Sequence, residues 1–305
     1  MEGPQVPRGW NATTIGSLVG RRYLVTGATS GLGLETARAL SAHGAHVTIT
    51  ARRVEAARAM VADASARDFL ELDLADLSSV RAAAARIDEP YDVVILNAGV
   101  MWTPYRLTVD GFELQMATNH LGHFAFAGLI TPFIRERLVT VSSLYQRYGS
   151  FGDGSVEEIA RRCRGESPYS PAAAYGDSKL ANVLFTAEIE RRRLQSGWSF
   201  VALAAHPGWS NTNLFSAQGA ARGLAGRAAR WSARFLAQSA ARGALPQLCA
   251  ATWSPVRGGE YFGPRGVGEL RGLPQVTRPV ERARDVALAA NLWTVSQELT
   301  GVTWR

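Results

Sequence analysis

The chain has 305 residues, 33 basic and 26 acidic side chains, a formal net charge of +7 and 47% hydrophobic residues. This composition is typical of globular proteins, and no apolar run approaches the roughly 18 residues that a membrane-spanning helix needs. The two cysteines, Cys163 and Cys249, are too few for a disulfide framework, and the start of the chain lacks a signal-peptide layout, so we expect a cytoplasmic protein. Thirty-two of the basic residues are arginine, which leaves Lys179 as the only lysine. The arginines are spread along the chain without a recognisable binding module, so we expect no nucleic-acid partner.

From Arg22 onward, short β-branched runs alternate with stretches rich in Ala, Leu and Arg, which predicts βαβ units. The expected strands are 22–26, 46–51, 69–72, 92–96, 137–141, 199–204 and 259–262. The expected helices are 32–43, 54–64, 77–87, 110–130, 173–195, 225–250 and 281–298. With right-handed crossovers, these elements form a single α/β domain of the Rossmann type, a doubly wound parallel sheet of about seven strands with helices on both faces. A ligand would bind beyond the carboxyl ends of the strands.

Two segments, at about 144–172 and 210–245, lie outside this alternation and are expected on the substrate side. The first contains many Gly and Pro residues and leaves room for a short helix at 155–163. The second has helical apolar spacing over 215–243, which fits a lid, a partner-facing helix or ordinary packing. Trp209, Trp231, Phe215 and Phe235 fit an apolar substrate pocket as well as a core. The link from Phe133 to the strand at Arg137 is unusually short.

A glycine-rich turn follows the first expected strand and leads into a helix. Such a turn brings the backbone close to a pyrophosphate, which the free N–H groups and the dipole of the helix N-terminus stabilise. It could also be a plain strand-to-helix loop. Its candidate cofactor-binding residues are Thr26, Gly27, Thr29, Ser30, Gly31, Leu32 and Gly33.

The end of the second expected strand carries Arg52 and Arg53, where an acidic residue would accept hydrogen bonds from the ribose 2′-hydroxyl of NAD. Two guanidinium groups can instead donate to a 2′-phosphate. The sequence therefore favours NADP, although two solvated arginines at a helix start would give the same pattern.

Tyr175 and Lys179 are four residues apart in an expected helix, so both lie on one face. Free tyrosine has a pKa near 10, and bringing it to about 7 requires about 4 kcal/mol of phenolate stabilisation. A neighbouring ammonium and a positively charged nicotinamide ring are suitable sources. We expect the compact ammonium of Lys179 to bind both ribose hydroxyls in a geometry that arginine does not fit.

Together with the glycine-rich turn, this pair resembles the short-chain dehydrogenase/reductase family, and the resemblance covers roughly residues 10–304. Further family motifs occur in the expected order. They are Asp73 with Leu74, Asn97 with Ala98 and Gly99, Asn119, Ser143, and Pro207 with Gly208 and Thr212. Within the family, the motifs around Asn119, Tyr175 and His206 are similar to the branch of retinol dehydrogenases, the WW-domain oxidoreductase and many bacterial oxidoreductases.

The resemblance implies a role for each of these residues. Tyr175 is the general acid in carbonyl reduction and the base in alcohol oxidation, and Ser143 binds the substrate oxygen. Lys179 orients the ribose and lowers the pKa of the tyrosine, while Asn119 supports a proton relay through water. Asp73 and Leu74 flank the adenine. The Asn97–Gly99 turn, Pro207, Gly208 and Thr212 complete the cofactor site.

We therefore predict an NADP(H)-dependent carbonyl reductase or alcohol dehydrogenase for a lipophilic substrate, as a monomer or homo-oligomer. A tailoring ketoreductase, a C=C reductase and a non-catalytic NADP-binding regulator remain as alternatives. We expect no metal at His120 and His123, whose spacing lacks further ligands. His206 is expected to pack or to bond the backbone, and Asp177 to be solvated.

Overall fold

The computed structural model describes residues 5–210 and 238–304. Its strands are β1 (Arg22–Val25), β2 (His46–Ala51), β3 (Asp68–Glu71), β4 (Tyr91–Leu96), β5 (Ile134–Val141), β6 (Val201–Ala205), β7 (Tyr261–Pro264) and β8 (Pro274–Thr277). Its α-helices are α1 (Gly31–Ala42), α2 (Val54–Ala62), α3 (Leu77–Ala84), α4 (Leu114–Met116), α5 (Gly122–Leu129), α6 (Val156–Cys163), α7 (Pro171–Ser196), α9 (Ala240–Gly243), α10 (Leu245–Thr252) and α11 (Val286–Thr300). A π-helix, η2, spans Ala117–Leu121, and short 3-10 helices include η4 (Leu144–Tyr148), η6 (Val267–Glu269) and η7 (Glu281–Arg284).

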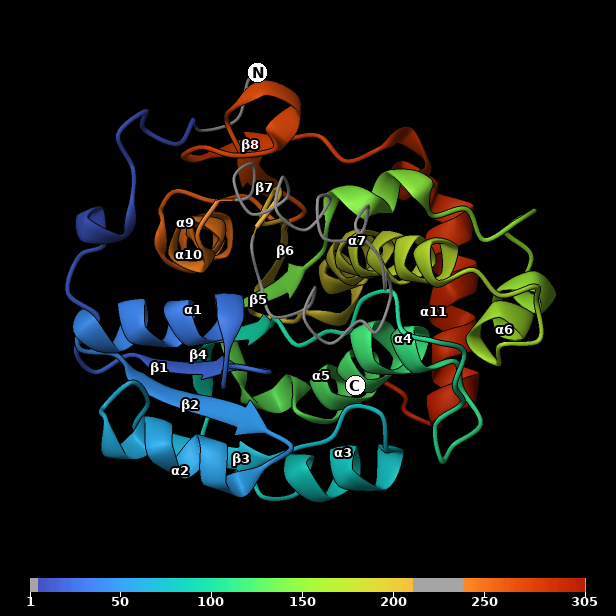
Figure 1. Cartoon of the computed structure of the whole chain (residues 1–305), viewed down its shortest axis with the longest axis horizontal. Coiled ribbons are helices and arrows are strands. Elements are labelled where there is room, and N and C mark those ends of the chain that lie inside the picture. The colour runs from blue at the N-terminus through green and yellow to red at the C-terminus, as the bar shows by residue number, and fades with distance from the viewer. Residues whose placement is uncertain (1–4, 211–237, 305) are drawn as a thin grey trace, which may run out of the picture.

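All eight strands form one sheet in the order β3-β2-β1-β4-β5-β6-β7-β8 (Figure 1). The first seven are parallel, which confirms the predicted doubly wound arrangement, and β8 pairs antiparallel with β7. The eighth strand was not predicted. It is a four-residue edge strand that begins at Pro274, and proline is tolerated there because an edge position does not need its N–H group.

Three expected boundaries were wrong. The helix expected over 281–298 begins at Val286, after the separate 3-10 helix η7. Strand β5 begins at Ile134, which pairs with Tyr91, so the residues expected as a short link are the start of the strand. The helix expected over 110–130 begins at Leu114 and changes to π-helical geometry at Ala117. The short helix expected at 155–163 is confirmed as α6. Of the helix expected at 225–250, α9 and α10 are described, and the rest lies outside the described residues.

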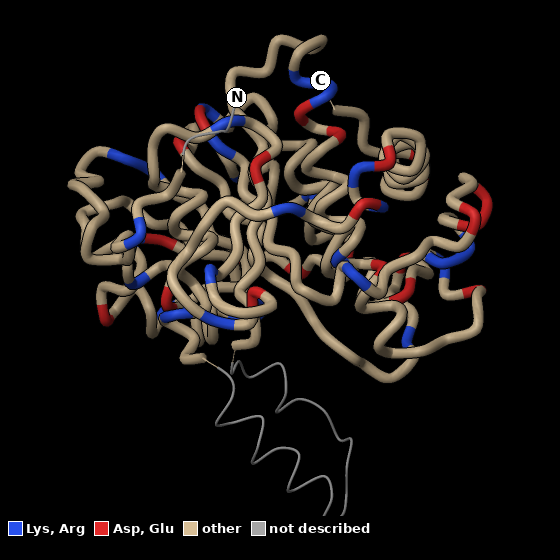
Figure 2. Tube along the Cα trace, turned by 90° about the horizontal axis from the view of Figure 1, so that it is seen from above, with Lys and Arg blue, Asp and Glu red and all other residues tan. Residues whose placement is uncertain are grey.

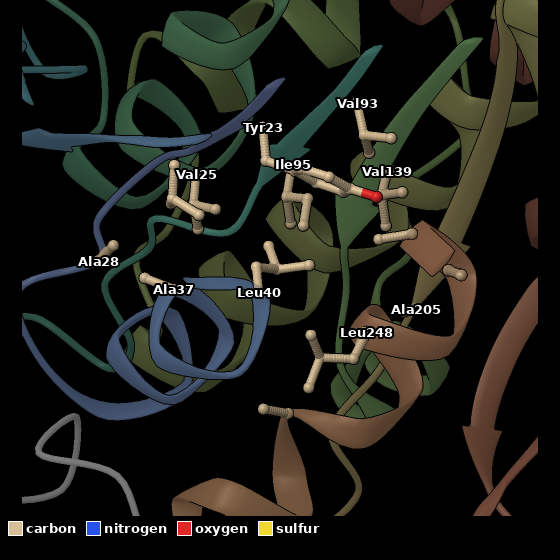
Figure 3. Packing of buried hydrophobic residues seen from close by; sticks show 14 of the residues in the cluster. Tyr23, Val25, Ala28, Ala37, Leu40, Val93, Ile95, Val139, Ala205 and Leu248 are labelled. Carbon is tan, nitrogen blue, oxygen red and sulfur yellow. The ribbon is translucent and has the colours of Figure 1, made fainter. Parts of the chain in front are cut away.

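Alternate residues of the strands point to opposite faces and form two apolar layers. On one face, Val25 and Ile95 pack with Leu40 of α1 and Leu248 of α10 (Figure 3). On the other face, the neighbouring residues Leu24, Val94 and Leu96 pack against α3, α5, α7 and α11. Burying one such side chain contributes roughly 1.5–3 kcal/mol, so the layers hold the strand ends in a fixed arrangement.

No helix within residues 5–210 and 238–304 is long and apolar enough to cross a membrane. Lys and Arg are interleaved with Asp and Glu over the described trace (Figure 2). The excess of positive charge is therefore not gathered on one side of that part of the molecule.

Candidate functional site

A cavity of about 950 Å³ lies at the carboxyl edge of the sheet. It is lined by residues that follow the ends of β1 to β6, together with η4 and the loop after β7. Most of the predicted site residues line it, namely Gly27, Thr29, Ser30, Gly31, Leu32, Gly33, Arg52, Arg53, Asp73, Leu74, Asn97, Ala98, Gly99, Ser143, Tyr175, Lys179, Pro207 and Gly208. Thr26 and Asn119 lie directly behind the wall, fully buried, and Thr212 lies outside the described residues.

The glycine-rich turn packs tightly against the end of β4. Gly27 has a φ of 63°, and a Cβ there would lie 2.7 Å from the Cα of Ala98. A Cβ at Gly33 would lie 2.6 Å from both the Asn97 Nδ2 atom and the Gly27 carbonyl oxygen. At the start of α1, the side chain of Ser30 makes no capping hydrogen bond. Ser30 therefore leaves the first N–H groups of α1 uncapped. These groups lie where the backbone forms the wall of the cavity.

Thr26 and His123 connect this turn to the π-helix. The hydroxyl oxygen of Thr26 accepts hydrogen bonds from the N–H groups of Asn97 and Ala98, both at 2.9 Å. Its own hydrogen is therefore free to be donated to Nε2 of His123, 2.9 Å away. Nδ1 of His123 must then carry the ring proton and donate it to the carbonyl of Asn119 at 3.1 Å. Burial lowers the pKa of His123 to about 3, which keeps this neutral tautomer in place.

Asn119 lies in the π-helix η2, an irregularity that occurs frequently at functional sites. Its side-chain oxygen accepts from the Val100 N–H at 2.8 Å, and its amide donates to the Val100 carbonyl and the Ser178 hydroxyl, both at 2.9 Å. The side chain thus ties the turn after β4 to α7. Ser178 was not identified from the sequence, because serine within a helix carries no distinguishing pattern.

Tyr175 and Lys179 come from the first half of α7, which begins at Pro171 after the Ser170 N-cap. Both side chains are buried, with 6% and 4% exposure, and the Lys179 Nζ atom lies 5.7 Å from the centre of the Tyr175 ring. The ammonium donates to the Val141 carbonyl at 3.0 Å. The Ser143 hydroxyl forms a hydrogen bond with Tyr175, so the predicted triad of side chains is brought together at the end of β5.

In the chain without a cofactor, the pKa of Tyr175 is raised. Burial raises it to about 12, and this outweighs the lowering by the hydrogen bond from Ser143. Burial also lowers the pKa of Lys179 to about 8. The predicted lowering included a positively charged nicotinamide as well as the ammonium, whereas the chain alone shows mainly the cost of removing a phenolate from water. At neutral pH, Tyr175 is therefore a protonated phenol beside a cationic Lys179.

Arg52 and Arg53 follow β2 at the adenine end of the expected site and are both exposed. The structure gives neither of them an ion pair with another described residue. Asp73 accepts from the Ala75 N–H at 3.0 Å, and this bond shapes the turn after β3. The guanidinium groups are thus available to an anion at that end of the cavity.

Three aromatic side chains beside Tyr175, namely Trp102, Tyr145 and Tyr148, form an aromatic wall of the cavity. Trp102 contacts Tyr145 edge to face at 5.4 Å, and Tyr145 in turn lies 5.3 Å from Tyr148 and 5.5 Å from Tyr175. Trp102 has a φ of 52°, which is uncommon outside glycine, and its N–H donates to the side chain of Gln115 at 2.7 Å. Neither Trp102 nor Tyr145 was identified from the sequence, because their roles come from contacts between separate loops.

Asp177 is not solvated, because it accepts from the Ser150 N–H at 2.8 Å and pairs with Arg162 at 2.7 Å. His206 bonds the backbone as expected, accepting from the Gly208 N–H. Trp209 lines the cavity, whereas Trp231, Phe215 and Phe235 lie outside the described residues.

The fold and this constellation define an oxidoreductase of the doubly wound α/β class, and comparison with known proteins agrees. A family model described as short chain dehydrogenase matches residues 21–155. Human retinol dehydrogenase 11 is 33% identical over 305 residues, covering 95% of this chain and 89% of the human protein. The chain belongs to the short-chain dehydrogenase/reductase family, in its retinol dehydrogenase-like branch.

Solved structures agree with this assignment. An uncharacterized protein from Mycobacterium paratuberculosis is 40% identical with a TM-score of 0.81, covering 97% of this chain and 99% of that one. A short chain dehydrogenase from Burkholderia cenocepacia J2315, solved in complex with NADP, is 25% identical with a TM-score of 0.59. That match covers 80% of this chain and 96% of the Burkholderia chain.

Proposed function

We propose that this protein is an NADP(H)-dependent oxidoreductase that interconverts a carbonyl group and an alcohol on a lipophilic substrate. The observation that carries the proposal is the group of Ser143 and the buried Tyr175 and Lys179 at the wall of a large cavity. A protonated phenol can donate to a carbonyl oxygen, and the Ser143 hydroxyl can stabilise the charge that develops there.

The residues present fit a dinucleotide. The pyrophosphate would bind at the start of α1, where the glycines leave room for it and Ser30 does not cap the helix. Lys179 would bind the ribose, because its ammonium has three N–H bonds and the described residues give it one acceptor. The adenine would lie beside Asp73 and Leu74, and the nicotinamide beside Pro207 and Gly208. Bound nicotinamide would supply or accept the hydride.

Side chains of the protein orient the substrate and transfer the proton. Ser143 orients the substrate oxygen, and Tyr175 transfers the proton to or from that oxygen. Lys179 keeps a positive charge near the phenol, and Asn119 holds the turn after β4 against α7. The raised pKa of Tyr175 in the chain alone means that the phenol carries its proton at neutral pH, as the acid role in carbonyl reduction requires.

The direct test is consumption of NADPH by the purified chain with a panel of lipophilic ketones and aldehydes, with the alcohol products identified by mass spectrometry. We expect an alcohol product with NADPH and a slower reaction with NADH. A product reduced at C=C with the carbonyl intact, or binding of NADPH without any turnover, would contradict carbonyl reduction.

Replacing Arg52 with alanine is expected to weaken NADPH binding by about 10- to 100-fold, because charge-assisted hydrogen bonds to the 2′-phosphate are lost. The affinity for NADH, which lacks that phosphate, should change by less than about twofold. Fluorescence titration of both reduced cofactors measures this. Arg58→Ala is the matched control, since Arg58 is exposed on α2 but does not line the cavity. Equal losses for both cofactors would remove the phosphate assignment.

Replacing Trp102 with alanine is expected to raise the KM for a lipophilic carbonyl by about tenfold, because a large apolar contact surface is lost. The NADPH affinity should be unchanged, and Trp102→Phe should restore most of the loss. Val109→Ala, an 83% exposed position beyond the same loop, is the control. An unchanged KM in Trp102→Ala would show that the substrate does not reach the aromatic wall.

A further inference from the structure

The loop at 266–272, between β7 and β8, holds a carboxylate in an unusual backbone conformation. Gly268 and Glu269 both have a positive φ, of 61° and 60°. Glycine adopts this region freely, whereas a glutamate there is strained. Gly268 and Leu270, on either side of Glu269, line the cavity. The strained residue therefore lies at the wall of the site, where surrounding contacts must hold its conformation.

The Glu269 carboxylate joins three separate segments. One oxygen lies 2.8 Å from Nε2 of His206, which follows β6, and the other accepts from the Thr277 hydroxyl on β8. A guanidinium nitrogen of Arg147, in η4, lies 3.6 Å from a carboxylate oxygen of Glu269. The Arg147 side chain is 44% exposed, so solvent screens this ion pair and it contributes little. The hydrogen bonds to His206 and Thr277 are therefore the main contacts of the carboxylate.

The hydrogen bonds of His206 determine which ring nitrogen carries the proton. Nδ1 accepts from the Gly208 N–H at 3.2 Å, so in the neutral ring the hydrogen is on Nε2 and is donated to Glu269. The side chain is fully buried, and a Cβ at Gly263 would lie 2.1 Å from Nε2. Because β7 leaves so little room, the imidazole keeps one orientation, with Glu269 on one side and the Pro207–Gly208 turn on the other.

The backbone of the 266–272 loop also packs directly on this turn. The Trp209 N–H donates to the Leu270 carbonyl at 2.7 Å. Gly208 has a φ of 66°, and a Cβ there would lie 2.5 Å from the same carbonyl oxygen. Gln238 closes the other side, with its amide 2.6 Å from the Pro207 carbonyl oxygen. The turn is thus held between two segments, and Glu269 reaches it through His206.

We propose that Glu269 is a positioning residue that acts through His206 to hold the Pro207–Gly208 turn at the nicotinamide end of the cavity. The inference rests on the proposed function only in placing the nicotinamide beside this turn. Loss of the carboxylate leaves the buried Nε2–H of His206 without an acceptor and removes the partner that keeps the ring proton on Nε2. The ring is too confined to turn, but with the proton on Nδ1 it no longer accepts from the Gly208 N–H. The turn then no longer presents a fixed surface to the cofactor.

The test compares Glu269→Met, which keeps the length of the side chain but removes both acceptors, with Glu269→Gln, which keeps an oxygen for His206. We expect Glu269→Met to weaken NADPH binding about tenfold and to lower kcat at saturating NADPH, and Glu269→Gln to stay within about threefold of the wild type. Glu281→Gln, an exposed carboxylate in η7 that does not line the cavity, is the matched control. NADPH affinity is measured by fluorescence titration and folding by the thermal midpoint.

Rescue by glutamine separates positioning from general stability. A Met variant with a lower thermal midpoint but unchanged NADPH affinity and kcat would overturn the inference, as would equal losses in the Gln and Met variants. Should Glu269→Met fail to fold, Thr277→Val is used instead. It removes the hydroxyl that donates to the Glu269 carboxylate, and we expect NADPH binding to weaken about two- to threefold. An unchanged affinity in Thr277→Val would then count against the inference. If the wild type binds NADPH but reduces no carbonyl, the proposed function fails while the affinity measurements still test Glu269.

Discussion

Tyr175→Phe is expected to lower the rate of carbonyl reduction by about a hundred- to ten-thousand-fold, the range typical for loss of a general acid. The variant keeps the ring, which is buried and in contact with Tyr145, and removes only the hydroxyl that bonds Ser143. Packing should therefore be preserved, and NADPH should bind with nearly the wild-type affinity. Single-turnover kinetics at saturating NADPH, together with fluorescence titration, measure both quantities.

Tyr148→Phe is the matched control for this variant. Tyr148 lines the same cavity and belongs to the same aromatic wall, but its side chain is 70% exposed. We expect it to retain most of the activity. Appreciable turnover by Tyr175→Phe would show that the proton comes from another group, and the acid role assigned to Tyr175 would be withdrawn.

Lys179→Arg is expected to lose most of the activity although the charge is conserved. The Lys179 side chain is buried, with 4% exposure, and its Nζ atom donates to the Val141 carbonyl oxygen at 3.0 Å. A planar guanidinium is larger than an ammonium and would have to displace the turn after β4 or withdraw from the ribose position. We expect kcat/KM to fall by about a hundredfold, with weaker NADPH binding.

The pH profile distinguishes this explanation from simple misfolding. Burial lowers the pKa of Lys179 to about 8, so in the wild type the ammonium is lost as the pH rises through about 8. Reduction by the wild type should therefore decline over that range, whereas Tyr175 stays protonated. The residual activity of Lys179→Arg should not decline there, because a guanidinium remains charged. A near-normal rate for Lys179→Arg, with Arg58→Lys as a control for charge-conserving exchange, would refute the requirement for lysine.

The alternation of apolar runs with helical stretches was enough to predict the parallel sheet, because buried strands and crossover helices leave distinct periodicities. It did not predict β8 or the start of β5 at Ile134. The first is a short edge strand that begins with proline, and the second depends on pairing with Tyr91 across the sheet. The π-helix around Asn119 was also missed, because its sequence is compatible with a regular α-helix.

The residues themselves determined the chemistry that is available. Glycines stand where the backbone turns tightly, a tyrosine and the only lysine are one helical turn apart, and a serine ends a strand. The glycine-rich turn and the Tyr175–Lys179 pair can be identified from spacing, whereas Ser143 was identified through the resemblance to the family. The carboxyl ends of parallel strands meet at one edge, so the sequence also indicated that these residues would lie together.

Only the tertiary structure decided the environment of these groups. Burial holds Tyr175 as a phenol with a raised pKa and lowers the pKa of Lys179, and neither direction can be derived from neighbouring residues in the chain. The hydrogen bonds of His123 and His206 select one tautomer each, through partners such as Thr26 and Glu269 that are 97 and 63 residues away. Solvation and long-range hydrogen bonding depend on which segments pack together, and that is settled when the chain folds.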